Sequence, residues 1–299
     1  MSSPPDVTAR ISRLFLYPVK SCAGIELRDC VLTDTGLDLD RAWMVVDEAG
    51  EFVTQREVPR LGLVRPKLGV HEMVLRAPGM LALHVQIDAV EQPAQVRVWD
   101  DVTPAYDMGD VAAQWFTDFL SLSADGLPGR SAKKYRMVRF DPEHRRLSSL
   151  KWTGGVEAPN QFADAYPLLV LGEASLEDFN SRLLAAGHAA VAMERFRPNI
   201  VLSGIEAHDE DRLDVLSVAA DGQTPVKLKA DKPCARCPIP NIDPATAQSS
   251  PEVGDMLQSY RKNDIVKGAP SFGMNLIVLE GDGQTLKVGQ DVVANWRFD

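Results

Sequence analysis

The 299-residue sequence has few cysteines, no long apolar run and no excess of positive charge. Its four cysteines (Cys22, Cys30, Cys234 and Cys237) are too few for a disulfide scaffold at this length, so we expect reduced thiols. No apolar run approaches the roughly 18 residues of a membrane span. The net charge of −10 argues against nucleic acid or an anionic membrane as a partner.

Signals for targeting and for fused redox domains are also missing. The first ten residues, MSSPPDVTAR, contain no apolar stretch typical of a secretory signal, so we expect a disordered lead-in over residues 1–9 and a cytoplasmic location. The cysteine spacing of a plant-type iron–sulfur domain and the Gly-rich dinucleotide fingerprint do not occur. Any electrons that the protein uses are therefore expected from a separate partner.

What the sequence does contain is a succession of short β-prone runs. Residues 10–21 form an apolar run stopped by Pro18, and residues 41–57 show two runs joined by a Gly-containing turn, which is typical of a hairpin. Further runs cover residues 199–204, 226–230 and 275–293, the last with a Gly-Asp-Gly turn before a shorter return strand. Many strands with few helices predict a β-rich mixed α+β fold built on a barrel or strongly bent sheet.

Three segments have helical patterns. In residues 109–121 and 173–187 apolar side chains recur at helical spacing, with Asp110 and Ser175 as expected N-caps and Gly187 as a stop; these side chains are Val111, Trp115, Phe116, Phe119 and Leu120, and Leu176, Phe179, Leu183 and Leu184. A weaker helix is expected within residues 251–263. The polar stretch 143–160 favours a linker, so we divide the chain into domains at 10–130 and 161–299, joined by residues 131–160.

The sequence CARC, Cys234 to Cys237, permits several kinds of site. A structural zinc site needs further close ligands, and neither a second cysteine pair nor an H-x₃₋₅-H pair occurs. A thioredoxin-type dithiol needs a helix after its first cysteine, which Pro238 and Pro240 disfavour, so we place the pair on a loop. Two inert loop cysteines remain an alternative. The cation of Arg236 favours a Cys237 thiolate, the form that binds soft metals.

The chain resembles the MOSC superfamily, and within it the branch of the amidoxime-reducing components and their bacterial relatives. Seven segments carry the resemblance in the family's order: LYPVKSCAGI, TGLDLDRAWMVVDEAGEFVTQRE, GEASLEDFNSRL, ERFRPNIVLSG, CARCPIPNIDPATA, LQSYRKN and TLKVGQDV. This resemblance implies an N-terminal MOSC β-barrel region followed by the MOSC domain proper. It also implies a molybdenum cofactor, a pterin dithiolene bearing a phosphate, in the cleft between them.

The resemblance implies the following site, residue by residue. Cys237 matches the protein ligand to molybdenum, and the cofactor contacts match Lys20, Ser21, Arg41, Asp164, Arg197, Asn199 and Arg236. Lysine, hydroxyl and arginine groups suit a phosphate, and Pro198 is expected to keep Arg197 extended, so that it and Asn199 face one ligand. The sequence departs from the pattern at Ala165 and Ala235, where relatives carry hydroxyl residues. The resemblance gives no role to Cys22 or Cys234.

The implied function is molybdenum-dependent reduction of N-hydroxylated compounds, as in detoxification, with electrons from a separate flavin, haem or iron–sulfur partner. One rival is a MOSC carrier that holds a persulfide or the cofactor on Cys237, and another is a β-barrel binding module without redox activity. Pyridoxal phosphate is associated with the superfamily, but no lysine context here indicates a Schiff base.

Overall fold

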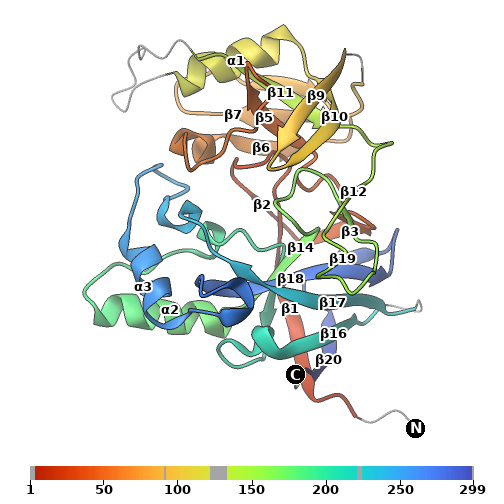
Figure 1. The fold of residues 1–299 in the computed structure, drawn as a ribbon, viewed down its shortest axis with the longest axis vertical. Coiled ribbons are helices and arrows are strands. Elements are labelled where there is room, and N and C mark those ends of the chain that lie inside the picture. The colour runs from red at the N-terminus through yellow and green to blue at the C-terminus, as the bar shows by residue number, and fades with distance from the viewer. Residues whose placement is uncertain (1–3, 91, 122–132, 221–223, 298–299) are drawn as a thin grey trace.

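The computed structural model describes residues 4–90, 92–121, 133–220 and 224–297, and Figure 1 shows them as two lobes rich in strands. The lower lobe is built on a closed seven-stranded ring in the order β15-β14-β18-β17-β16-β20-β1, which closes through the antiparallel pair β1–β15. Its strands are β1 (Val7–Leu16), β14 (Leu168–Gly172), β15 (Ile200–Ser203), β16 (Leu213–Val218), β17 (Val226–Ala235), β18 (Ser271–Glu280) and β20 (Asp291–Trp296). The short β2 (Ile25–Leu27) pairs with β1.

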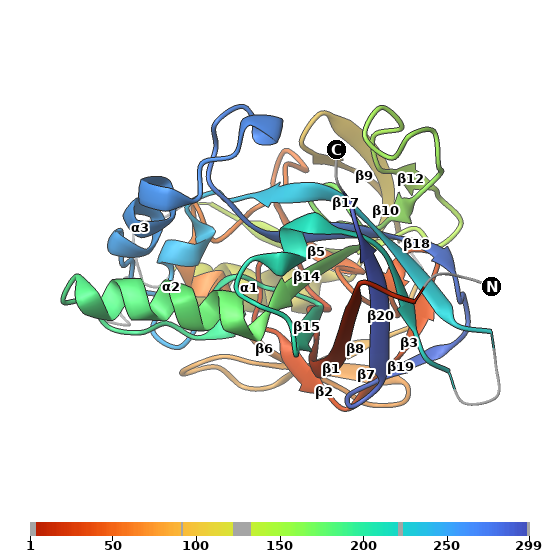
Figure 2. The same ribbon diagram turned by 90° about the horizontal axis from the view of Figure 1, so that it is seen from below.

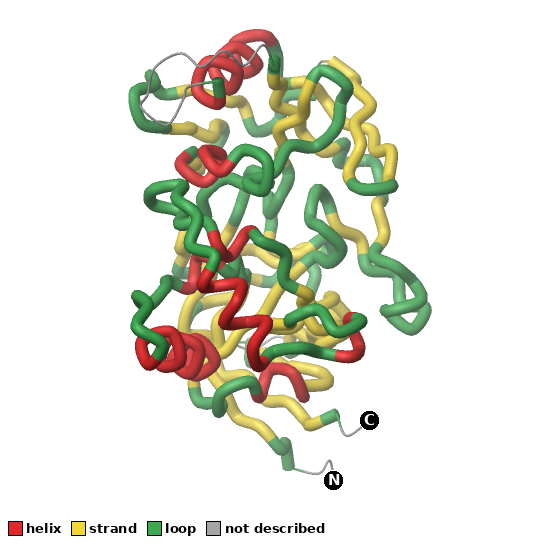
Figure 3. The backbone as a smooth tube through the Cα atoms, turned by 60° about the vertical axis from the view of Figure 1, so that its left-hand side comes forward, coloured by secondary structure: helices red, strands yellow, loops and turns green. Residues whose placement is uncertain are grey.

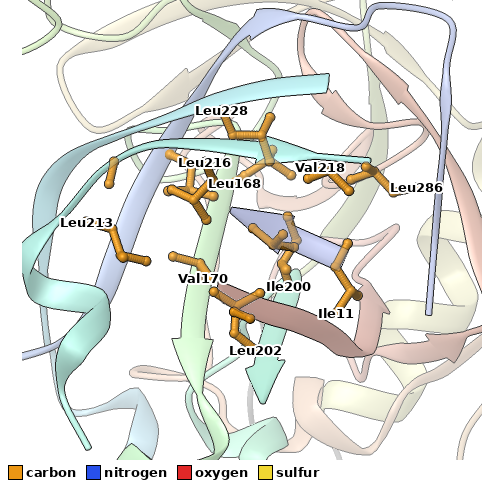
Figure 4. Packing of buried hydrophobic residues seen from close by; sticks show 14 of the residues in the cluster. Ile11, Leu168, Val170, Ile200, Leu202, Leu213, Leu216, Val218, Leu228 and Leu286 are labelled. Atoms are coloured by element: carbon orange, nitrogen blue, oxygen red, sulfur yellow. The ribbon is translucent and has the colours of Figure 1, made fainter. Parts of the chain in front are cut away.

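Alternation of apolar and polar residues explains how the ring closes on a core. Along β1, Val7, Ala9 and Ile11 are buried while the residues between them are exposed, as expected for one face turned inward. Figure 4 shows Ile11 among inward residues of the other strands, including Val170, Ile200 and Leu228, and Val7 and Ala9 belong to the same cluster. The barrel is therefore filled by branched side chains, and a ligand site has to lie outside it.

The upper lobe contains two smaller antiparallel sheets. One has the order β5-β11-β10-β9, and the other has the order β6-β7-β8. The strands are β5 (Trp43–Asp47), β9 (Gln92–Val98), β10 (Asp101–Asp107), β11 (Tyr135–Phe140), β6 (Arg65–Leu68), β7 (Glu72–Arg76) and β8 (Leu83–Gln86). Two further small sheets are separate from these: a three-stranded one in the order β19 (Thr285–Lys287), β3 (Asp29–Thr33), β4 (Gly36–Leu37), and the pair β12 (Arg146–Leu147) with β13 (Pro159–Asn160).

The three α-helices of the described residues lie on the outside of the sheets (Figure 3). They are α1 (Asp110–Leu120) in the upper lobe, and α2 (Glu173–Ala185) and α3 (Glu252–Tyr260) beside the barrel, where Figure 2 shows them on one side. Short 3₁₀ turns are η1 (Pro59–Leu63), η2 (Met193–Arg195), η3 (Asp209–Arg212), η4 (Ile239–Asn241) and η5 (Asp264–Val266). Within the described part of the chain, no helix is both long and apolar enough to span a membrane.

The β-rich fold and the three helices agree with the sequence predictions, but the helix details differ. Gly109 and Gly172, rather than Asp110 and Ser175, occupy the N-cap positions. Ser175 lies inside α2, where its hydroxyl donates to Glu210 and accepts from the His208 amide. Val111 and Leu184, predicted on the buried stripes, are exposed, because the neighbouring sheets cover only the opposite sides of α1 and α2.

Several predicted connections were wrong because tertiary pairing decided them. Residues 135–140, expected within a linker over 131–160, form β11 between β5 and β10. In contrast, the expected hairpin over 41–57 does form in short form, because β5 and the return run share the Val46–Phe52 bridge and backbone hydrogen bonds on either side of it. The run after the Gly-Asp-Gly turn pairs with β3, not with β18. Strand β1 begins at Val7, inside the expected lead-in, and it belongs to the barrel of the C-terminal half.

Candidate functional site

A pocket of about 140 Å³ opens between the two lobes. One wall comes from the segments after β1 and around β5, and the other comes from the segments before β14 and β15 and the end of β17. All predicted site residues line it: Lys20, Ser21, Arg41, Asp164, Arg197, Asn199, Arg236 and Cys237. The fold therefore brings together side chains spread from position 20 to position 237, while their roles as ligands stay a prediction.

Lys20 and Asp164 form an ion pair between the two walls of the pocket. The Lys20 Nζ atom donates to Asp164 Oδ1 at 2.5 Å and to the Phe162 carbonyl at 2.8 Å. Burial lowers the pKa of Lys20, and Asp164 opposes this shift. Partial loss of hydration would raise the pKa of Asp164, but the Lys20 charge and hydrogen bond outweigh this effect and lower that pKa to about 2. The Asp164 side chain is 61% exposed, so an anion that reaches Lys20 meets this carboxylate.

Arg41 is held by groups from both lobes. Its Nη1 atom donates to the Asp40 carboxylate and to Asn199 Oδ1, the latter at 3.2 Å, and its Nη2 atom donates to the Arg197 carbonyl at 3.2 Å. The guanidinium carbon also lies 4.5 Å from the centre of the Tyr17 ring. These contacts fix the guanidinium group in one orientation at the pocket wall, which suits recognition of a phosphate.

Arg197 lies beside Arg41 and contacts the same tyrosine. Its guanidinium carbon is 4.2 Å from the centre of the Tyr17 ring, and its Nη1 atom donates to the Cys22 carbonyl at 2.6 Å. Burial and the Arg41 charge lower the pKa of Arg197. The expected extended backbone is wrong: φ is 56° at Arg197, where the chain leaves the η2 turn.

Three of the predicted site residues have a left-handed backbone. The φ angles of Ser21, Arg41 and Arg197 are 64°, 52° and 56°, a region that side-chain-bearing residues seldom adopt. Each such residue costs about 1–3 kcal/mol, and such strain gathers at functional sites. Ser21 is buried at the pocket, and Gln55 donates to its carbonyl at 2.6 Å. The strain supports a shared role for these three residues at the pocket.

Asn199 and Arg236 line the pocket, but their side chains are largely occupied by the protein. Asn199 donates to the Phe15 carbonyl at 3.2 Å and accepts from the Leu169 amide and from Arg41. Arg236 donates to the Phe196 and Phe272 carbonyls through three nitrogen atoms. The geometry thus assigns both residues a structural task in addition to the predicted cofactor contact.

The two cysteines of CARC differ in their settings. Strand β17 continues to Ala235, so Cys234 lies in a strand and not on the expected loop, while Cys237 follows the strand and is exposed. Burial raises the pKa of the Cys234 thiol, and Arg236 opposes that shift. Cys22 is fully buried, and burial raises its pKa to about 12. Cys237 is therefore the thiol best placed to meet a ligand in the pocket.

The sequence reasoning missed residues that support or line this site. Thr54 and Arg195 line the pocket, and Tyr17 and Asp40 contact Arg41. All four lie inside the segments that carried the family resemblance. Their roles could not be predicted, because from the sequence alone a tyrosine is equally consistent with the hydrophobic core and an aspartate with a turn.

Comparison with known proteins agrees with this architecture. The profile of the MOSC N-terminal beta barrel domain matches residues 8–123, and that of the MOSC domain matches residues 157–293. The mitochondrial amidoxime reducing component 2 of Rattus norvegicus is 34% identical over 298 residues, covering 94% of this chain and 82% of the relative.

The chain belongs to the MOSC family. Among other MOSC proteins, the mitochondrial amidoxime-reducing component 1 of Homo sapiens is 33% identical over 94% of this chain and 82% of its own length. The molybdenum cofactor sulfurase of Bos taurus is 26% identical over 86% of this chain, which corresponds to 29% of the sulfurase. The resemblance to the family and the barrel fold predicted from the sequence are thereby confirmed.

Proposed function

We propose that this MOSC protein is a molybdenum-cofactor-dependent reductase of N-hydroxylated compounds. The observation that carries the proposal is the exposed thiol of Cys237 in one pocket with Lys20, Arg41 and Arg197. Relatives at 33–34% identity are named amidoxime-reducing components, which supports the same class of reaction here.

The residues of the pocket fit the chemical parts of this cofactor. A thiolate from Cys237 suits a soft metal. Lys20, Arg41 and Arg197 come from both lobes and give the pocket three local cations. A dianionic phosphate can therefore bind there although the protein carries a net charge of −10. The charge of Arg41 lies close enough to disfavour the charge of Arg197, and a bound anion would relieve that repulsion.

When bound, the cofactor supplies the two electrons that cleave the N–O bond; with two protons, a hydroxylamine then becomes an amine and water. The chain's own task is to bind and orient. Cys237 would hold the metal, and Lys20, Ser21, Arg41 and Arg197 would hold the phosphate end. Asp164 stays ionised at neutral pH because of Lys20, and Cys234 stays protonated because burial raises its pKa.

The test is turnover by protein expressed in a host that makes the cofactor. We expect stoichiometric molybdenum, and reduction of a hydroxylamine or amidoxime by a chemically reduced dye, which replaces the external electron donor. Cofactor-loaded protein that leaves all such compounds unreduced would refute the proposal. The cytoplasmic location also stays a prediction, to be tested by cell fractionation.

A second candidate is a carrier of sulfur or of the cofactor. The exposure of Cys237 favours it, because a persulfide needs an accessible thiol, and a relative at 26% identity is named molybdenum cofactor sulfurase. Persulfide on Cys237 without hydroxylamine turnover would support the carrier over the reductase.

A further inference from the structure

Tyr17 is shared by the two arginines of the pocket. Its ring centre lies 4.5 Å from the guanidinium carbon of Arg41 and 4.2 Å from that of Arg197. Tyr17 directly follows β1, whereas Arg41 precedes β5 and Arg197 precedes β15. One aromatic side chain therefore joins cations from three separate segments of the chain.

The two cations need such a partner because they lie together, both partly buried, at the wall of the pocket. An aromatic face attracts cations, and this attraction is strongest where water is excluded. Arg41 uses three of the five N–H donors of a guanidinium group within the protein, and Arg197 uses one. Both residues line the pocket, so unused donors remain available to an anion there.

The backbone and the surroundings of Tyr17 hold its ring in place. The Tyr17 amide donates to Asp40 Oδ1 at 2.9 Å, and the Tyr17 carbonyl accepts from the Arg41 amide at 2.8 Å. A Cβ atom at Gly24 would lie only 2.5 Å from the ring atom Cε1, so the glycine leaves space that the ring fills. The Tyr17 backbone is thus tied to the same Asp40 carboxylate that binds the Arg41 side chain.

The hydroxyl group of Tyr17 contributes nothing visible to this arrangement. It is buried and has no hydrogen-bond partner among the described residues. Burial raises the pKa of Tyr17, so the side chain is neutral and offers the arginines no negative charge. The interaction with the two guanidinium groups therefore belongs to the ring.

We propose that Tyr17 is a positioning residue whose ring sets Arg41 and Arg197 as one pair for a phosphate group. The assignment of that phosphate to the cofactor rests on the proposed function, whereas the pairing of the arginines does not. Without the ring, the two cations lose their common contact and are free to move apart. Removal of the ring should weaken anion binding, whereas removal of the hydroxyl group alone should not.

The experiment measures the binding of inorganic phosphate to the cofactor-free protein. Affinity is determined by calorimetric titration and, independently, from the increase in Tm that phosphate produces. We expect Y17L to weaken phosphate binding about tenfold, because two cation–π contacts are lost, and Y17F to stay within about threefold of the wild type. F116L is the matched control, since Phe116 is a fully buried aromatic residue of the upper lobe packed against Trp115. It should lose stability but bind phosphate as the wild type does.

Three results would overturn the proposal: wild-type affinity in Y17L, an equal loss in Y17F and Y17L, or the same loss in F116L. If Y17L fails to fold, Y17F and Y17M replace it, and equal affinity of these two variants refutes the role of the ring. Failure of the proposed function would appear separately. In that case the phosphate results would stand while cofactor-loaded wild type left hydroxylamines unreduced.

Discussion

The Lys20 ammonium nitrogen lies 2.5 Å from a carboxylate oxygen of Asp164, and this contact joins the upper lobe to the segment before β14. The pair places a charge of each sign at the pocket wall. Because the Asp164 carboxylate already binds Lys20, a phosphate must displace this carboxylate to contact the Lys20 ammonium group. D164N should therefore bind inorganic phosphate more tightly than the wild type, as measured by calorimetry.

The same ion pair predicts a dependence of stability on acid pH. The pKa of Asp164 falls from its ordinary value of 3.8 to about 2. A depressed carboxyl pKa stabilises the fold above about pH 4, and that stabilisation is lost as the pH falls through about 2. The urea midpoints of wild type and D164N should differ at pH 5 and converge toward pH 2. A constant gap would contradict this, and D282N, at an exposed turn, is the control.

The buried carboxyl group of Glu210 predicts the opposite trend, a loss of folding stability as the pH rises toward neutral. It is fully buried beside α2; burial raises its pKa from 4.5 to about 7, although Ser175 donates to it at 2.7 Å. A raised carboxyl pKa gives stability below about pH 4.5 that is lost as the pH rises through about 7, amounting to about 3 kcal/mol. E210Q should keep its stability from pH 5 to pH 8 where the wild type declines. Parallel curves from chemical denaturation would refute this.

Cys237 and Cys234 should respond differently to substitution. Because Cys237 is exposed, C237S should leave the Tm nearly unchanged, yet molybdenum retention should fall at least about tenfold and activity with it. C234S is the matched control and should retain the metal. Elemental analysis gives the metal content of both variants. Equal molybdenum content in C237S and wild type would refute the assignment of Cys237 as the metal ligand.

Arg236 should matter more for stability than for anion binding. Its three donor nitrogens bind the Phe196 and Phe272 carbonyls, which R236M would leave unpaired at a cost of about 1–3 kcal/mol. We expect a lower urea midpoint and nearly unchanged phosphate affinity. R197M should show the reverse, a nearly unchanged urea midpoint and weaker phosphate binding, because the Arg197 side chain donates one hydrogen bond within the described protein. A tenfold loss of phosphate affinity in R236M would instead support a direct contact between Arg236 and the anion.

Local patterns in the sequence were enough for the class of fold, for the three helices and for several of the strands. Short β-prone runs bounded by turn residues predicted several strands, and the helical spacing of Trp115, Phe119, Phe179 and Leu183 placed two helices near their observed bounds. These features depend on neighbouring residues, whose spacing is fixed by the period of a helix or strand. The family motifs likewise named eight residues that the pocket brings together.

The partners of each strand and side chain were settled only by the tertiary structure. Strand β1 joins the barrel of the C-terminal half, and residues 135–140 enter a sheet instead of linking two domains. Arg41 and Arg197 lie 156 positions apart, yet one hydrogen bond and one tyrosine ring join them. Composition and periodicity cannot predict such contacts, because they join residues far apart in the sequence that meet only when the whole chain has packed.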